Sequence, residues 1–172
     1  RHFYDPIVRN RRVKSPAELV IGAVRTLRTP VRDLDVLMQA MDLMGQSLMF
    51  PPSVKGWDGG RAWINTSTLF IRQNAMNFLL TGKLPTGYDG SASTERFDPT
   101  PMLEPLRESD PAAVHDAEKV TDYVLRFCLG QSPEHARRTV SEFAMGHRGE
   151  ISADLVRGML LLVSAMPEYQ LC

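Results

Sequence analysis

Five residues in the first half of the chain could take part in chemistry: Trp57, Asp58, Arg61, Trp63 and Arg72. The two tryptophans offer flat apolar faces, and the charged side chains offer a polar rim. This combination is common where proteins bind sugars or peptides. Two interpretations follow from it. Either these residues form a ligand platform, or the tryptophans fasten a loop onto a helical core.

Arg72 stands out because it lies inside the apolar arc of its expected helix. Leu69, Ala75 and Met76 belong to the same arc. An unpaired guanidinium among apolar side chains costs several kcal/mol, so we expect a carboxylate or a backbone carbonyl beside Arg72. Asp58 is the nearest acidic residue in sequence, and pairing with it would pin the loop to the helix. The other interpretation of Arg72 is an anion-binding side chain in a cleft.

The common catalytic and metal-binding motifs are missing from the sequence. There is no CxxC pair, no HExxH, no GxSxG and no P-loop. The histidines are scattered among polar and charged neighbours, which is typical of surface residues: His2, His115, His135 and His147. We therefore predict no metal and no cofactor, and we assign no catalytic residue.

Composition narrows the class of protein. Of the 172 residues 43% are apolar, which is enough for a buried core, and the 20 basic side chains balance the 20 acidic ones. A net charge of zero argues against a protein that binds nucleic acid by bulk charge. No apolar run approaches the roughly 20 residues of a membrane span, so we expect none. Cys128 and Cys172 could pair or remain thiols, and the sequence leaves both states open.

The elements that must position these residues are expected to be helices. Apolar residues recur with helical spacing, and no alternating run indicates a strand. The fold class is therefore all-α: an irregular bundle of about six helices, with a long Gly/Pro/Trp loop between the second and the third. Local start and stop signals place the helices at about residues 16–29, 34–44, 65–81, 111–128, 134–145 and 152–164.

The second of these helices has a narrow polar strip and is expected to be central. The strip consists of Asp35, Gln39 and Asp42, and apolar residues cover the other sides. The methionines in and after this helix are expected to fill the core: Met38, Met41, Met44 and Met49.

The chain is expected to divide at residues 83–111, which are rich in Gly, Pro, Ser, Thr and Asp. An N-terminal helical unit with the tryptophan loop covers 1–82. A C-terminal helical unit covers 112–172, and the connector between them has a helical turn at about 102–107. Together they are expected to form one compact domain. Because the sequence starts at Arg1 without methionine, we expect it to be the C-terminal fragment of a longer protein.

Several motifs in this order resemble the C-terminal part of a large bacterial family, domain of unknown function 1800. The residues that carry the resemblance are Lys14-Ser15-Pro16-x-Glu18-Leu19-Val20, Met44-Gly45-Gln46-x-Leu48-x-x-Pro51-Pro52-x-Val54-Lys55-Gly56-Trp57-x-Gly59-Gly60-x-x-Trp63-Ile64, Arg72-x-Asn74 and Pro167-Glu168-Tyr169-Gln170. The resemblance implies an exported bacterial protein, located in the periplasm or cell envelope and often encoded beside a sulfatase-like partner. The family has no established activity and no assigned catalytic residues, so the resemblance carries neither over to this chain.

These observations predict a structural or binding module of the cell envelope. Its expected partners are another protein, the missing N-terminal part of the same chain, or a glycan, and not nucleic acid. The alternative is a hydrolase-type enzyme whose site is shared with a missing N-terminal segment. A large exposed apolar face on the first or second helix would indicate a partner that covers it.

Overall fold

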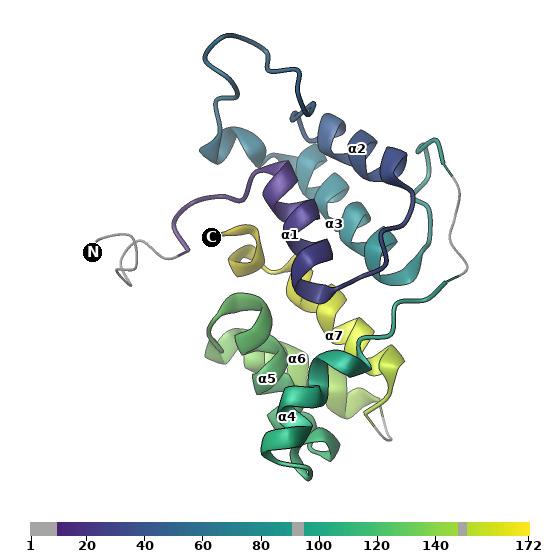
Figure 1. Cartoon of the computed structure of the whole chain (residues 1–172). Helices are drawn as coiled ribbons and strands as arrows, with labels where there is room; N and C mark the ends of the chain where they lie inside the picture. Colours follow the sequence, from purple (N-terminus) through teal and green to yellow (C-terminus); the bar gives the residue numbers. More distant parts are fainter. Residues whose placement is uncertain (1–9, 91–94, 148–150) are drawn as a thin grey trace. The chain divides into compact units, whose positions relative to one another are not determined.

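The computed structural model describes residues 10–90, 95–147 and 151–172, and in these ranges it contains seven α-helices, four short 3-10 helices and no strand (Figure 1). The all-α prediction is confirmed. The chain forms two compact units, one up to Phe97 together with Gln170–Cys172, and the other from Asp98 to Tyr169. Their boundary falls within the connector expected at 83–111.

Three helices build the first unit: α1 (Pro16–Leu27), α2 (Leu34–Leu43) and α3 (Thr66–Thr81). They contact one another in all three pairs, and α3 supplies the most deeply buried side chains. Phe78, Leu79 and Leu80 have no exposed surface. This core fixes the face that α2 turns to solvent.

Each helix of the first unit starts at a side chain that caps it. Ser15 and Glu18 form a capping box at α1, and Asp33 accepts hydrogen bonds from two backbone amides of α2. Asn65 caps α3 and forms a second capping box with Thr68. Side chains that bind the unpaired amides of the first turn fix a helix start locally, and so these starts were predictable.

The methionine prediction is only half right. Met41 and Met44 are buried in the core, whereas Met38 is 53% exposed and Met49 is 88% exposed. The prediction that this helix, α2, is central is therefore wrong. It packs on α1 and α3 through one face and leaves apolar side chains on the other.

The second unit contains α4 (Glu104–Ser109), α5 (Ala117–Leu129), α6 (Glu134–Gly146) and α7 (Ala153–Ala165). The last three of these pack against one another. Short 3-10 helices lie at Thr100–Leu103, Ala113–His115 and Pro167–Gln170.

One helix start in the second unit was predicted too early. We expected a helix from Pro111 or Ala112, but α5 begins at Ala117. Asp116 is in an extended conformation and accepts hydrogen bonds from the amides of Glu118 and Lys119. This cap sets the start of α5 because an aspartate in that position satisfies two amides of the first turn.

Candidate functional site

Among the predicted site residues, Trp63 fastens the long loop to α3. It ends the 3-10 helix Gly60–Trp63 and is 7% exposed. The Thr68 hydroxyl donates a hydrogen bond of 3.0 Å to the Trp63 carbonyl. The indole lies so close to Gly45 and Gly59 that a Cβ on either would be in van der Waals contact with it, at 3.8 and 3.7 Å.

Arg72 is buried on α3, with only 1% of its surface exposed. Its Nη2 donates to the Lys14 carbonyl at 2.7 Å, and its Nη1 donates to Oε1 of Gln170 at 3.1 Å. Burial away from water lowers the pKa of Arg72 to about 10. A carbonyl partner for Arg72 was expected and is present. The prediction that Asp58 pairs with it is wrong.

The reason is that Arg72 holds two segments that pair with each other and do not belong to the tryptophan loop. The backbone of Lys14 donates to the Gln170 carbonyl at 2.8 Å, and Arg12 and Cys172 exchange two further backbone hydrogen bonds. Arg72 therefore pins residues 12–14 and 170–172 to α3, and does not pin the loop. This role is structural.

The other three predicted site residues lie nearer the surface. Trp57 is half-buried, and Asp58 and Arg61 are exposed. Within the described part of the chain, no hydrogen bond or ion pair joins any of them to Arg72. Arg72 thus shares no described polar contact with the other four residues of the set.

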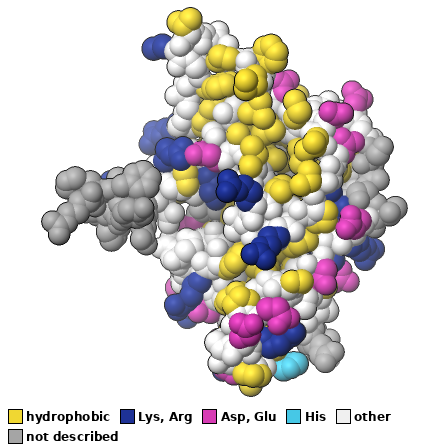
Figure 2. All heavy atoms as spheres, in the orientation of Figure 1, with side chains coloured by type: hydrophobic (Ala, Val, Ile, Leu, Met, Phe, Trp, Pro, Cys, Tyr) yellow, Lys and Arg dark blue, Asp and Glu magenta, His cyan; other side chains and the backbone are white. Residues whose placement is uncertain are grey.

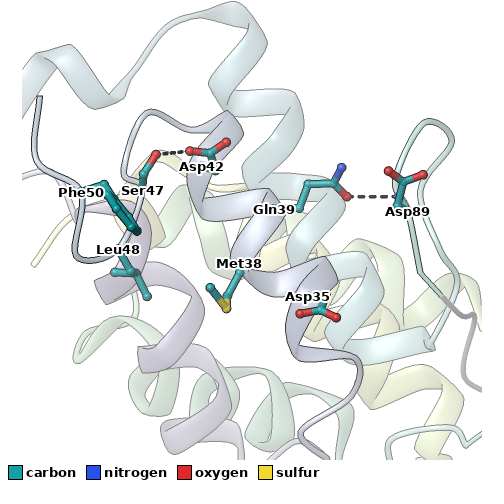
Figure 3. Close-up of a pocket in the computed structure, with 8 residues that line it drawn as sticks. All are labelled: Asp35, Met38, Gln39, Asp42, Ser47, Leu48, Phe50 and Asp89. Carbon is teal, nitrogen blue, oxygen red and sulfur yellow. Dashed lines mark hydrogen bonds between the residues drawn. The ribbon is translucent and has the colours of Figure 1, made fainter.

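A different set of residues encloses a groove on α2. It has a volume of about 390 Å³ and opens to solvent along the outer face of the helix (Figure 3). The lining residues come from α2, from the loop that follows it and from a later turn: Asp35, Met38, Gln39, Asp42, Ser47, Leu48, Phe50 and Asp89.

Two hydrogen bonds hold the sides of this groove to α2 (Figure 3). The Ser47 hydroxyl donates to the Asp42 carboxylate, which fixes the loop that carries Leu48 and Phe50. The backbone amide of Asp89 donates to Gln39 Oε1 at 3.2 Å, which fixes the opposite side. The groove is therefore formed by the folded chain and needs no ligand to assemble it.

The groove combines negative charge with apolar surface. Asp35, Asp42 and Asp89 line it, whereas no lysine or arginine does. Across the described ranges none of these three carboxylates forms an ion pair. Phe50, which is 79% exposed, and Met38 add the apolar part.

Further exposed apolar side chains extend this surface beyond the groove. Figure 2 shows hydrophobic side chains gathered over the upper part of the face in view, where α1, α2 and the following loop lie in Figure 1. The exposed large apolar residues of these elements are Ile21, Leu34, Met38, Leu43, Met49, Phe50 and Val54.

Sequence reasoning missed the groove, although part of its signal was present. Asp35, Gln39 and Asp42 were recognised as the polar strip of α2, and their spacing places them on one side of the helix. The contribution of Asp89 depends on a contact with Gln39, 50 residues away in sequence, and that of Phe50 depends on how the loop after α2 folds back, neither of which a local pattern reveals. In the ranges that the structure describes, no three His, Cys, Asp or Glu residues are grouped so that they could hold a metal ion.

Comparison with known proteins identifies a family. The model of the family described as "Protein of unknown function (DUF1800)" matches residues 1–171. No curated protein and no solved structure matches the chain. None of the helices in the described ranges combines the length and the apolar character needed to cross a bilayer.

Proposed function

The chain belongs to the DUF1800 family of proteins of unknown function, and from this premise we propose that it is a structural or binding module of the bacterial cell envelope. Its partner is another protein, which covers the apolar outer face of α2 and the loop that follows. The resemblance to exported bacterial proteins supports the location. The exposed apolar surface around the α2 groove supports the binding role.

That surface is the observation on which the proposal depends. Proteins that act alone rarely leave several large apolar side chains together in water, and larger patches usually mark interaction sites. Burying apolar surface contributes about 25 cal/mol for each Å² removed from water. Phe50 and Met38 lie beside one groove and have most of their surface available for this gain.

Photo-cross-linking in living cells tests the proposal. A photoreactive phenylalanine analogue replaces Met38 in the full-length protein, and in a second strain it replaces Met145 of α6. Met145 is a matched control because it is also an exposed methionine, at 61%, and does not line the groove. We expect one adduct of defined mass from position 38 in the envelope fraction and none from position 145. Equal labelling at the two positions, or recovery of the protein outside the envelope fraction, would overturn the proposal.

A glycan is the second partner class. Trp57 is half-buried, and Asp58 and Arg61, which follow it closely in sequence, are exposed. An aromatic face next to polar groups suits sugar binding. If this loop binds a glycan, Trp57→Ala will abolish binding to an envelope glycan array and Phe50→Ala will not.

The enzyme alternative, a hydrolase, has one observation in its favour. The Ser47 hydroxyl donates to the Asp42 carboxylate in a groove that Asp35 and Asp89 also line, and carboxylates can act as general acids and bases. A hydrolase would lose turnover in the Asp42→Asn variant while it kept its partner. A binding module has no turnover to lose.

A further inference from the structure

We propose that the α2 groove binds a basic amphipathic helix of the partner protein. This inference rests on the proposed function and names the chemistry of the partner. It follows from the charge of the groove, from the spacing of the aspartates along α2 and from the apolar side chains between them.

The spacing along α2 suits a helix that lies beside it. Asp35, Met38 and Asp42 occupy positions i, i+3 and i+7, so they lie on one side of two helical turns. At 1.5 Å per residue, the two aspartates are about 10.5 Å apart along the axis. A partner helix repeats its own side chains at the same interval. Lysine or arginine at i and i+7 can therefore lie opposite Asp35 and Asp42, with an apolar residue between them opposite Met38.

The other side of the groove supplies the apolar contact that such a helix needs. Leu48 and Phe50 project from the loop that Ser47 ties to α2 (Figure 3). A cavity of about 390 Å³ lies within the range of pockets that accept large apolar groups. Amphipathic helices bind proteins by placing their apolar side chains in grooves of this kind.

The charge of the groove, the all-helical fold and the residues that line the groove each argue against another class of partner. Nucleic acid and anionic lipid surfaces carry negative charge, which Asp35, Asp42 and Asp89 repel. An extended peptide that adds to a sheet has no template, since the described part of the chain contains no strand. Proline-rich segments dock in aromatic grooves, whereas Phe50 is the only aromatic residue among those that line this one.

Fluorescence anisotropy with synthetic peptides tests the inference on the whole chain. The probe is a labelled 16-residue helical peptide with leucines on one face and lysines beside them. One control peptide keeps the leucines and replaces each lysine by glutamate, and another has the first peptide's residues in scrambled order. We expect the basic helix to bind more tightly than both controls and to weaken as salt is added.

Two protein variants locate the binding. Asp35→Asn, Asp42→Asn and Asp89→Asn together should weaken binding of the basic peptide about tenfold, because the negative charge that attracts its lysines is removed from three exposed positions. The matched control removes the same charge from exposed positions of the second unit with Glu108→Gln, Glu118→Gln and Glu142→Gln, none of which lines the groove, and should bind normally. Phe50→Ala should also weaken binding about tenfold.

The outcomes separate this inference from the proposed function. Equal binding of the acidic and basic peptides, or full binding by the triple aspartate variant, would overturn the inference. So would sedimentation that shows a dimer lost in Phe50→Ala, since the occupant would then be a second copy. If an adduct still forms at position 38 in cells in those cases, the binding module stands and only the basic helix is rejected. Loss of that adduct would reject both.

Discussion

At the scale of single residues, the structure shows why an arginine lies inside an apolar helix face. Arg72 joins α3 to two segments that are 58 and 98 residues away in sequence. Its burial was predictable from the helical periodicity and so was the need for a partner. The identity of the partners was not, because Lys14 and Gln170 meet Arg72 only in the folded chain.

Replacing Arg72 should destabilise the first unit. Arg72→Ala removes two hydrogen bonds, leaves the Lys14 carbonyl and the Gln170 amide without this partner, and opens a cavity. We expect a loss of about 2–4 kcal/mol in the free energy of unfolding, measured in urea. Arg72→Lys keeps the charge but has fewer hydrogen-bond donors. Its free energy of unfolding should lie between those of Arg72→Ala and the wild type. An unchanged unfolding midpoint in Arg72→Ala would contradict the structural role.

Glu18 gives the stability of the same region a dependence on pH. Hydrogen bonds from Arg12 and then from Ser15 lower the pKa of Glu18 from 4.5 to about 2. Because folding lowers this pKa, ionised Glu18 stabilises the fold. Its contribution to the free energy of unfolding is complete above about pH 4.5 and is lost as the pH falls through about 2. The side chains of Arg12 and Glu18 are 62% and 40% exposed, so their ion pair contributes at most about 1 kcal/mol to the free energy of unfolding.

The Glu18→Gln variant tests this dependence. We expect the urea midpoint of the wild type to fall between pH 4.5 and pH 2 more steeply than that of Glu18→Gln. Parallel curves for the two proteins over this range would show that the pair with Arg12 does not contribute.

At the scale of elements, α2 shows what local patterns determine and what they leave open. Asp33 marks the start of this helix, and the strip of Asp35, Gln39 and Asp42 marks its polar side. The pattern could not show that some of the apolar residues of α2, such as Met38, remain exposed and do not enter the core. Met38, on the outer side of α2, is 53% exposed, and only the folded structure shows that.

Two methionines three residues apart on α2 test this division. Met41 is 4% exposed and Met38 is 53% exposed. Met41→Ala should lower the free energy of unfolding by about 2–5 kcal/mol because it empties a core position. Met38→Ala should change it by less than about 0.5 kcal/mol. Thermal unfolding of both variants measures the difference, and similar losses would mean that α2 is buried on both sides.

At the scale of the whole molecule, the division into two units was foreseeable only in part. The composition of residues 83–111 indicated a connector, and the boundary between Phe97 and Asp98 lies within it. That Gln170–Cys172 returns to the first unit could not be predicted, because it depends on backbone pairing with Arg12 and Lys14. A net charge of zero likewise gave no sign of a local concentration of aspartates.

Shortening the chain by its last three residues tests that return. A protein that ends at Tyr169 loses the bond from Arg72 to Gln170 and three backbone hydrogen bonds to residues 12–14. At about 0.5–1.5 kcal/mol for each of these four bonds, the first unit should lose about 2–6 kcal/mol. Cys172→Ser keeps the backbone pairing and should unfold like the wild type. Equal stability of the chains with and without residues 170–172 would show that the pairing does not hold the unit together.

The binding role of the α2 groove is the claim on which the functional account depends. The yield of cross-linked adduct at position 38 relative to position 145, in cells that contain the full-length protein, measures it most directly. We predict a single partner at position 38, loss of that adduct when Phe50 is changed to alanine, and no adduct at position 145. Equal yields at the two positions, or an adduct at position 38 that persists in Phe50→Ala, would contradict the account.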